Sequence, residues 1–401
     1  MQRSAGQDRV GMPPMVAAGS ATLVLALALQ LLALRHGAHG SISDLPHVFL
    51  HRGIRPGTLP YLDRPIEYPV LAGFLLYAAS LVWASPVGVL LVTAVAASAL
   101  FLTVTALLAR RFGARAWRWA IATPVMLYAF QNWDLFAIAA LVVGLLAFER
   151  RRDGTAGAAF GVGGAIKLFP LVVVPPLAVY RWTRGDRRGA QRLLAAGGAT
   201  FALLNLPIAA INRSGWWWPY AFQSRRDPTW GTAWFYGFRA LGLPIHGPAG
   251  AHLATIVSAA ALLGGMAWLL AITVHRRLDP FGAAAAAVAI FVLCNKVYSP
   301  TYDVWLVAFF VMLPLSRRLW VSFCAVDAAV FVTVYGFFAG IDSIGFVRAV
   351  LPFLVLVRTG VLLTLIRRAT ASPTHTTAPT VASTTARLGE GHAVGQSGSR
   401  L

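Results

Sequence analysis

The sequence predicts an all-α protein that crosses a membrane many times, and three observations lead to this fold class. Of the 401 residues, 58% are hydrophobic and only 12% are charged, whereas about a quarter of the residues in a soluble domain are charged. Apolar runs of roughly 18 or more residues recur along the chain, and each is long enough to cross a hydrocarbon core of about 30 Å. Short arginine clusters separate these runs, as in the cytoplasmic loops of membrane proteins. We therefore expect a polytopic helical bundle of about 11–12 membrane segments with external loops.

The net charge of +20 does not indicate a nucleic-acid-binding protein. The cations lie in short clusters between apolar spans, where they set orientation, and do not form one basic face. The two cysteines, Cys294 and Cys324, lie in apolar spans, so no disulfide framework is expected. Only two of the 34 cations are lysine, and this arginine- and alanine-rich bias is typical of a bacterial source with a GC-rich genome.

The first apolar run, Val16 to Leu34, follows a short N-terminal arm, residues 1–15, that carries Arg3 and Arg9. The run is longer than the core of a signal peptide, which has about 7–15 residues, so we interpret it as an uncleaved signal anchor. Further apolar runs occupy residues 86–109, 117–131, 134–148, 155–182, 190–211, 251–274, 280–297, 301–316, 319–339 and 345–366.

The arginine clusters predict the orientation of these spans. They lie at residues 110–118, 150–152, 181–188, 276–277, 317–318 and 367–368. If every cluster is cytoplasmic, the chain crosses an even number of times between neighbouring clusters. This condition holds if 155–182 is a broken pair that turns near Lys167 and if 68–84 does not cross fully. Both termini then lie on the cytoplasmic side of a cell membrane. So do 22 of the 34 cations, in agreement with the positive-inside rule.

This topology divides the chain into a membrane domain, residues 16–366, and a tail, residues 367–401. The tail is rich in Thr, Ser, Ala and Gly and cannot bury a core, so we expect it to be disordered and cytoplasmic. Two long segments remain external, residues 35–67 and 212–250. The second is rich in tryptophan, which suits either an interfacial aromatic belt or stacking on sugars or a polyprenyl chain.

The outward-facing ends carry polar motifs in a characteristic order. They are Ser43-Asp44-Leu45, Gly57 to Asp63, Ile66-Glu67-Tyr68-Pro69, Gln131-Asn132-Trp133-Asp134, the stretch GVGGAIKLFP at 161–170, and Asn295 to Tyr302. Together they resemble the motifs of polyprenol-phosphate-mannose-type GT-C glycosyltransferases, and more narrowly those of glycosyltransferase family 87, the actinobacterial α-mannosyltransferases. The resemblance spans residues 16–366. One departure is Val70, where the family often has a second proline, but Pro69 alone still suits a helix start.

The resemblance implies an enzyme that moves a sugar, most often mannose, from a polyprenyl-phosphate donor. The acceptor would be a cell-envelope glycolipid or glycan on the extracytoplasmic side of the bilayer. The alternative class is a transporter or flippase of a lipid-linked saccharide, which should carry charges at the bilayer midplane and show repeat symmetry. The polar residues here collect instead at outer helix ends and in one acidic loop, which favours the enzyme.

Asp44 is the predicted catalytic residue. Glycosyl transfer needs a base that takes the proton of the acceptor hydroxyl, and in an inverting displacement base and leaving group lie on opposite faces of the sugar. Asp44 follows the end of the first span by ten residues and matches the base position of the family. A structural alternative is helix capping, because Ser43 and Asp44 precede the run Leu45 to Leu50. The two roles can coexist.

The other candidates are predicted to bind donor or acceptor. They are Asp63, Arg64, Glu67, Tyr68, Asn132, Asp134, Lys167, Lys296 and Tyr298. The two lysines stand at outward-facing ends, where the positive-inside rule makes cations least expected, so a lipid-linked phosphate is a natural partner. Snorkelling to the outer head groups is the alternative. Asp63 and Glu67 can also pair locally with Arg64, and helix capping is the alternative for Asp134.

Three further features have mainly structural interpretations. Asp44, His47 and His51 would share one face of a helix and could hold a divalent metal, but the motif is loose, and we expect no metal or other cofactor. Asp327 and Arg358 fall within the last two spans, where mutual pairing is expected because lone intramembrane charges are costly. The spacing of Gly157 and Gly161 predicts close helix packing and not a phosphate loop.

Overall fold

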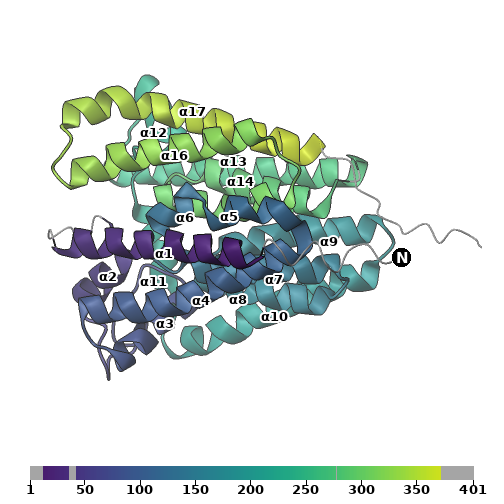
Figure 1. Cartoon of the computed structure of the whole chain (residues 1–401), viewed down its shortest axis with the longest axis horizontal. Coiled ribbons are helices and arrows are strands. Elements are labelled where there is room, and N and C mark those ends of the chain that lie inside the picture. The colour runs from purple at the N-terminus through teal and green to yellow at the C-terminus, as the bar shows by residue number, and fades with distance from the viewer. Residues whose placement is uncertain (1–11, 36–41, 277, 372–401) are drawn as a thin grey trace, which may run out of the picture.

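The computed structural model describes residues 12–35, 42–276 and 278–371. Within these ranges the regular elements are helices, and no strand occurs among them. The long helices lie side by side in one bundle, with the short helices α2 (Asp44–Arg52), α11 (Arg213–Arg225) and α12 (Ala233–Ala240) gathered at one end (Figure 1). The predicted all-α architecture is therefore confirmed.

The remaining elements follow the predicted apolar runs. They are α1 (Met12–Arg35), α3 (Val70–Val82), α4 (Pro86–Phe112), η1 (Gly113–Ala116), α5 (Trp117–Ala120), α6 (Thr123–Tyr128), α7 (Asp134–Glu149), α8 (Asp153–Ile166), η2 (Phe169–Val173), α9 (Val174–Thr183), α10 (Arg187–Ile211), α13 (Gly247–Arg276), α14 (Pro280–Cys294), η3 (Pro300–Asp303), α15 (Val304–Met312), α16 (Arg317–Phe338) and α17 (Ile344–Ala371).

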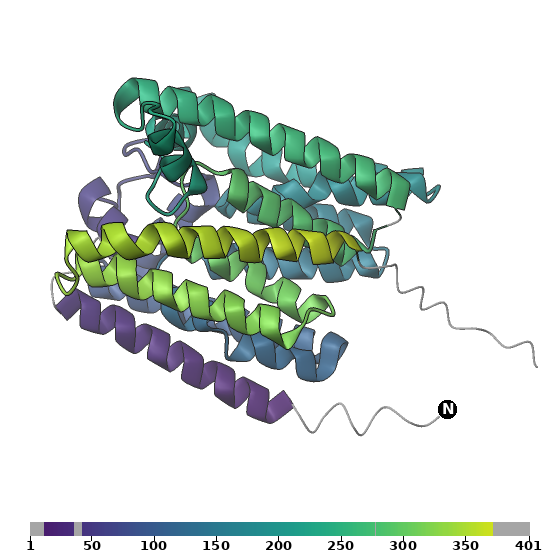
Figure 2. The same cartoon turned by 90° about the horizontal axis from the view of Figure 1, so that it is seen from above.

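Six of these helical stretches are long and apolar enough to cross a bilayer. They are α1, the stretch Pro86–Ala120 that begins with α4, α10, α13, α16 and α17. The chain is therefore a multi-pass membrane protein. Helices α1 and α13 lie on opposite sides of the bundle (Figure 2). Among the six, α13 is the least buried, so much of its surface is available to lipid.

Several apolar runs form broken rather than continuous helices. The run 155–182 is divided into α8 and η2–α9 with the turn at Lys167, as the arginine clusters predict. The run 117–131 divides between α5 and α6, where Pro124 stands in the first turn of α6. Helix α3 has 13 residues, which corresponds to about 20 Å and is too short to cross, in agreement with the expectation for 68–84.

Two helices extend past the predicted boundaries of the membrane domain. Helix α1 begins at Met12, inside the predicted arm, and α17 continues to Ala371, inside the predicted tail. Residues 1–11 and 372–401 lie outside the described part of the chain, so the structure does not test the disorder predicted for the tail. The start of α1 and the end of α17 point toward the same end of the bundle (Figures 1 and 2).

Ion pairs join the helix ends at the arginine-rich end of the bundle. The buried pair of Arg181 Nε and Asp153 Oδ1 is 2.8 Å long and joins the end of α9 to the start of α8. Asp186, just before α10, lies 3.8 Å from Arg181 and 3.5 Å from Arg151. Because α8 runs away from this end to Lys167 and α9 returns to it, Lys167 is separated from these ion pairs by the 14 residues of α8, which correspond to about 21 Å.

Helices α8 and α10 approach closely at the predicted glycine pair. A Cβ atom added at Gly157 would lie 2.3 Å from the carbonyl oxygen of Leu193, and one added at Gly161 would lie 2.7 Å from that of Gly197. The interpretation of these glycines as a helix-packing motif is confirmed. This contact positions α8, which carries Lys167 at its C-terminal end.

Gly157→Ala is expected to destabilise the protein by about 1–3 kcal/mol, because the new methyl group meets backbone atoms that cannot rotate away. Gly154→Ala on the same helix is the matched control, since nothing lies within 4 Å of a Cβ atom at that position. Thermal unfolding of both variants in the same detergent measures the difference. Equal midpoints for the two variants would contradict the proposed tight contact.

Candidate active site

The start of α2 is held by the loop between α6 and α7. The backbone N–H of Asp44 donates to the carbonyl oxygen of Gln131 at 2.8 Å, and the buried hydroxyl of Ser43 donates to the carbonyl oxygen of Phe130 at 3.2 Å. Gln131 is fixed in turn by the Tyr335 hydroxyl, which donates to its side-chain oxygen at 2.9 Å. Two motifs that are far apart in the sequence therefore determine together where Asp44 lies.

The side chain of Asp44 does not cap α2. Ser43 occupies the N-cap position without a capping hydrogen bond, and the Tyr68 hydroxyl donates to Oδ2 of Asp44. Burial and the neighbouring carboxylate hold the pKa of Tyr68 well above its ordinary value, so the phenol remains a donor. Oδ1 of Asp44 has no hydrogen-bond partner among the described residues and can accept a hydrogen bond from another donor.

Lys167 is enclosed by one carboxylate and three aromatic rings. Its Nζ lies 2.8 Å from Oδ1 of Asp134, and both side chains are buried. The same Nζ lies 5.2 Å from the ring centre of Tyr68, 5.8 Å from that of Tyr302 and 5.7 Å from that of Trp305. Aromatic faces stabilise a cation that has lost water, so this arrangement favours the charged lysine at a buried position. Snorkelling to the surface is not what this lysine does.

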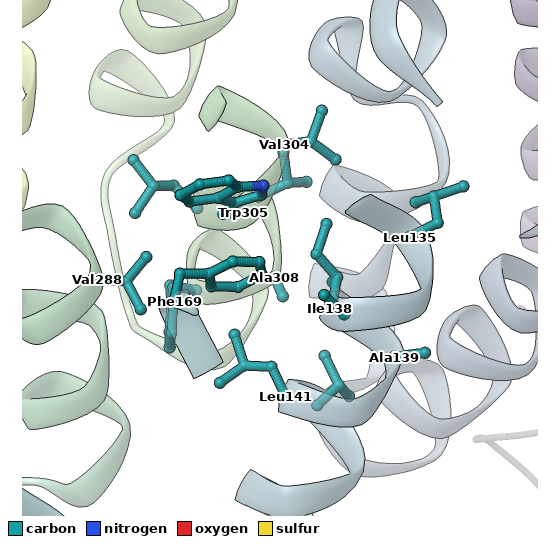
Figure 3. Packing of buried hydrophobic residues seen from close by; sticks show 14 of the residues in the cluster. Leu135, Ile138, Ala139, Leu141, Phe169, Val288, Val304, Trp305 and Ala308 are labelled. Atoms are coloured by element: carbon teal, nitrogen blue, oxygen red, sulfur yellow. The ribbon is translucent and has the colours of Figure 1, made fainter. Parts of the chain in front are cut away.

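Stacked rings hold the aromatic enclosure in place. Trp305 stacks on Phe169, with ring centres 4.2 Å apart and planes 9° from parallel, and on Tyr302 at 4.1 Å. Figure 3 shows Trp305 and Phe169 packed one above the other, with Ile138 of α7 and Val288 of α14 nearby. Such close packing permits few alternative rotamers.

The motif that contains Asp134 is also ordered locally. The side-chain oxygen of Asn132 accepts a hydrogen bond of 2.9 Å from the backbone N–H of Asp134, which orders the turn that leads into α7. Trp133 is fully buried and contacts the Tyr68 ring edge-on, with ring centres 4.9 Å apart. Asn132 thus positions Asp134, and the Asp134 side chain pairs with Lys167 instead of capping the helix.

Lys296 joins three segments at the same end of the bundle. Its Nζ donates to the carbonyl oxygens of Ser224 at 2.8 Å and Ala251 at 3.1 Å and to the Thr255 hydroxyl at 2.7 Å. Burial lowers the pKa of Lys296 to about 8; Asp227 opposes this shift and Arg226 adds to it. Lys296 therefore has a structural role that the sequence did not indicate.

Both lysines line one cavity of about 620 Å³. Its polar wall includes Glu67, Lys167, Asn295 and Lys296. Its apolar wall includes Leu168, Phe169, Ala259, Leu262 and Phe291, with Pro219, Tyr220, Gln223 and Ser224 of α11 on another side. The α13 residues in this wall, Thr255, Ser258, Ala259 and Leu262, follow helical spacing and form one face. The cavity is thus charged at one part and apolar along the bilayer-facing helix α13.

The other predicted residues lie in different positions relative to this cavity. Tyr68 lines it, whereas Asp44, Asp134, Asp63, Arg64 and Tyr298 do not. Glu67 accepts a hydrogen bond from Nε of Arg52 at 2.7 Å, so the expected pairing with Arg64 is wrong. Asp63 is exposed and accepts from the backbone N–H of Leu59 at 2.7 Å, which closes a local turn. The loop residues Asp63 and Arg64 are therefore separate from the charged wall.

The buried charges of the last two spans, Asp327 and Arg358, are arranged around Asp303, which sequence analysis missed. Arg358 lies 3.8 Å from Asp303, which is fully buried and accepts a hydrogen bond from Tyr298. Asp327 faces Asp303 and does not form the predicted ion pair with Arg358. Arg358 also stacks on the Tyr298 ring at 3.6 Å. The pairing is different because Asp303, five residues after Tyr298, enters the bundle on η3.

His47 and His51, two of the three residues considered as metal ligands, lie close together on α2. The rings of His47 and His51 are 4.2 Å apart, and burial, with a smaller effect of His51, lowers the pKa of His47. Within the described ranges, no group of three or more His, Cys, Asp or Glu side chains is arranged to hold a metal ion. The structure therefore offers no support for a metal at Asp44.

The aromatic residues of the second external segment differ in their positions relative to the cavity. Of the α11 aromatics, Tyr220 lines the cavity, and Trp216, Trp217 and Trp218 do not. Trp216 donates from its indole nitrogen to the side-chain oxygen of Asn205 at 3.1 Å, which fixes α11 against α10. Trp217 is exposed, as expected for a residue of an interfacial belt.

Comparison with known proteins identifies the family. No curated protein matches this chain. The model of glycosyltransferase family 87 matches residues 67–300, a range that includes Glu67, Tyr68, both lysines and the Asn132–Asp134 motif and begins after Asp44. This match covers more than half of the chain, and it agrees with the bundle of apolar helices and with the resemblance of the polar motifs. The chain belongs to glycosyltransferase family 87 and is a membrane glycosyltransferase.

Proposed function

We propose that this protein is a GT-C-type enzyme that transfers a sugar from a polyprenyl-phosphate donor to a cell-envelope glycolipid or glycan. Its family resemblance favours a mannosyl residue as this sugar. The reaction takes place on the extracytoplasmic side of a bacterial cell membrane. The observation that carries this proposal is the cavity with two lysines in one wall and an apolar wall along α13. A lipid-linked donor matches these two walls, because it has an anionic phosphate next to a long hydrocarbon chain.

The charges around the cavity suit a phosphodiester. Lys167 is balanced by Asp134, and Glu67 is balanced by Arg52. Lys296 contacts only neutral acceptors and leaves one positive charge in the wall at neutral pH. A polyprenyl-phosphate sugar carries one negative charge on its phosphate, so its binding neutralises the cavity. The polyprenyl chain would lie against Ala259 and Leu262 of α13.

Tyr68 separates the two chemical functions of the proposed site. Its hydroxyl contacts Asp44, and its ring contacts Lys167. In the proposed reaction the sugar of the donor lies near Tyr68, Lys167 stabilises the phosphate that leaves, and Asp44 takes the proton of the acceptor hydroxyl from the other side. Lys167 and Lys296 supply the positive charge for the leaving group, and no metal is required in this proposal.

The direct test is transfer by the purified protein in detergent. The protein is incubated with mannose-labelled polyprenyl phosphate and an envelope glycolipid extract, and labelled products are identified by mass spectrometry. Polyprenyl-phosphate glucose and a nucleotide-linked mannose serve as alternative donors. We expect label transfer only from the lipid-linked donor, with release of polyprenyl phosphate. Transfer from the nucleotide sugar alone would contradict the proposal, and analysis of glycolipids in a deletion strain would identify the acceptor.

Donor binding is expected to weaken as the pH rises through about 8, because Lys296 loses its proton there. The donor phosphodiester does not change its charge between pH 6.5 and 9.5, so the lysine is the titrating group. Because the anionic donor favours the protonated lysine, binding raises the pKa of Lys296 and takes up a proton. Donor affinity measured over this range should fall for the native protein and remain nearly constant for Lys296→Arg. A parallel fall in both would assign the titration to another group.

The orientation of the bundle is expected to place Arg55 and Leu241 outside the cell and Thr183 inside. All three side chains are exposed, so single cysteines at these positions in a background without Cys294 and Cys324 are suitable reporters. In intact cells, an impermeant maleimide should label Arg55→Cys and Leu241→Cys but not Thr183→Cys until the membrane is opened. The reverse pattern would place the cavity on the cytoplasmic side and exclude an extracytoplasmic reaction.

A further inference from the structure

A second cavity, of about 430 Å³, lies between α12, residues 245–246 and the first half of α17. It shares no lining residue with the donor cavity. Its floor includes Ile344, Val347, Leu351 and Pro352, which lie on one face of α17. Trp230 and Tyr236 are among the aromatic residues of its wall.

Two arginines open into this second cavity. Arg239, near the end of α12, and Arg348, in the second turn of α17, are exposed. Neither has a hydrogen bond or ion pair with another described residue, whereas His246 in the same wall lies 3.3 Å from Asp227. Both arginines lie at the end of the bundle opposite the arginine clusters, which is the end where unpaired cations are least expected.

We propose that this cavity binds the phosphate head group of an anionic membrane lipid, separate from the sugar donor. Guanidinium groups bind phosphate oxygens in a bidentate manner, and both Arg239 and Arg348 line this one cavity. Tryptophan and tyrosine favour the head-group level of a bilayer. The floor on α17 continues from the arginines toward the bilayer interior, so the first part of a hydrocarbon chain would lie against Val347 and Leu351. This apolar floor selects a lipid over a free phosphate ion.

The segment beside this lipid site is joined to the donor cavity. Trp230 precedes Gly231, whose carbonyl oxygen accepts a hydrogen bond from Arg358. The backbone N–H of Thr229 donates to the carbonyl oxygen of Lys296 at 3.0 Å, and the Thr229 hydroxyl oxygen accepts from the backbone N–H of Tyr298 at 3.0 Å. A lipid against Trp230 would therefore contact the same short segment that holds the backbone around Lys296.

Native mass spectrometry of the full-length protein in neutral detergent tests the lipid site directly. Phosphatidylglycerol is titrated into the native protein, into Arg239→Gln/Arg348→Gln and into the control Arg55→Gln/Arg213→Gln. The control arginines are also exposed at this end of the bundle but line neither cavity. Loss of two charge-assisted contacts should weaken binding of the lipid by about tenfold or more. The control should bind as the native protein does, and Arg239→Lys/Arg348→Lys should recover part of the affinity.

Competition distinguishes a lipid from a free anion. Phosphatidylcholine, inorganic phosphate and glycerophosphoglycerol are each added against bound phosphatidylglycerol, and we expect none of them to displace it at equal concentration. Displacement by inorganic phosphate would overturn the lipid assignment, as would equal phosphatidylglycerol affinity in all variants. Donor binding by the same preparations is recorded in parallel. Because the two cavities share no residue, failure of the lipid site and failure of the proposed transferase function give different results.

Discussion

Asp44→Asn is expected to lower the rate of sugar transfer by about 10²–10⁴-fold, which is the contribution of a positioned general base. Asparagine has nearly the same size as aspartate but cannot take up the proton of the acceptor hydroxyl. Turnover by the purified variant, with donor and acceptor at saturation, measures this loss. The affinity for the donor should change little, because Asp44 does not line the donor cavity.

The fold of this variant should be preserved for two reasons. The contact of residue 44 with Gln131 uses the backbone N–H, which the substitution does not alter. The hydrogen bond from the Tyr68 hydroxyl can be accepted by the amide oxygen of asparagine. A normal unfolding midpoint together with lost turnover would therefore identify a chemical role and not a structural one.

The neighbouring carboxylates provide matched controls for Asp44. Asp63→Asn changes an exposed turn residue, and transfer should remain close to normal. Glu67→Gln removes the partner of Arg52 from the cavity wall. We expect it to change donor affinity but to leave the rate of transfer at saturating donor close to normal. Near-normal transfer by well-folded Asp44→Asn would exclude it as the base. Collapse of turnover in the Glu67 variant alone would move the assignment to Glu67.

The positions and turns of the helices could be predicted from the sequence because the requirements of a bilayer apply to each short stretch of the chain. Apolar length and arginine clusters are local properties, and they predicted the turn at Lys167 and the incomplete crossing of 68–84. The contacts of the site depend instead on which helices are neighbours. The rings of Tyr302 and Trp305 around Lys167 come from a segment more than a hundred residues away, and no local pattern links them.

The incorrect pairings have the same origin. Arg64 is adjacent to Asp63 in the sequence, but Glu67 pairs with Arg52 because α2 folds back toward the start of α3. Asp327 and Arg358 were expected to pair because lone charges within the last two spans are costly, yet the ion pair of Arg358 is with Asp303. Asp303 could have been recognised as a third buried charge, since it follows the motif Asn295 to Tyr302 and precedes the apolar helix α15.

Lys167→Met is expected to abolish measurable donor binding and to destabilise the protein by about 3–5 kcal/mol, because Asp134 would remain as an unpaired buried charge. Methionine retains the length and packing of the side chain among Tyr68, Tyr302 and Trp305 but not the positive charge. Donor affinity and the unfolding midpoint are both measured. Lys167→Met alone does not show whether Lys167 binds the donor phosphate or only pairs with Asp134, because the substitution removes the ammonium group that either role requires.

A double variant separates the two roles of Lys167. Asp134→Asn removes the charge of the partner, so Lys167→Met/Asp134→Asn has no buried charge at this pair and should recover most of the lost stability. If Lys167 binds the donor phosphate, the double variant remains unable to bind donor, whereas Asp134→Asn alone keeps or increases the affinity because the ammonium group is no longer neutralised. If Lys167 serves only the ion pair, donor binding returns together with stability in the double variant. Recovery of both properties would therefore remove Lys167 from the proposed phosphate site and leave Lys296 as the cation of the cavity.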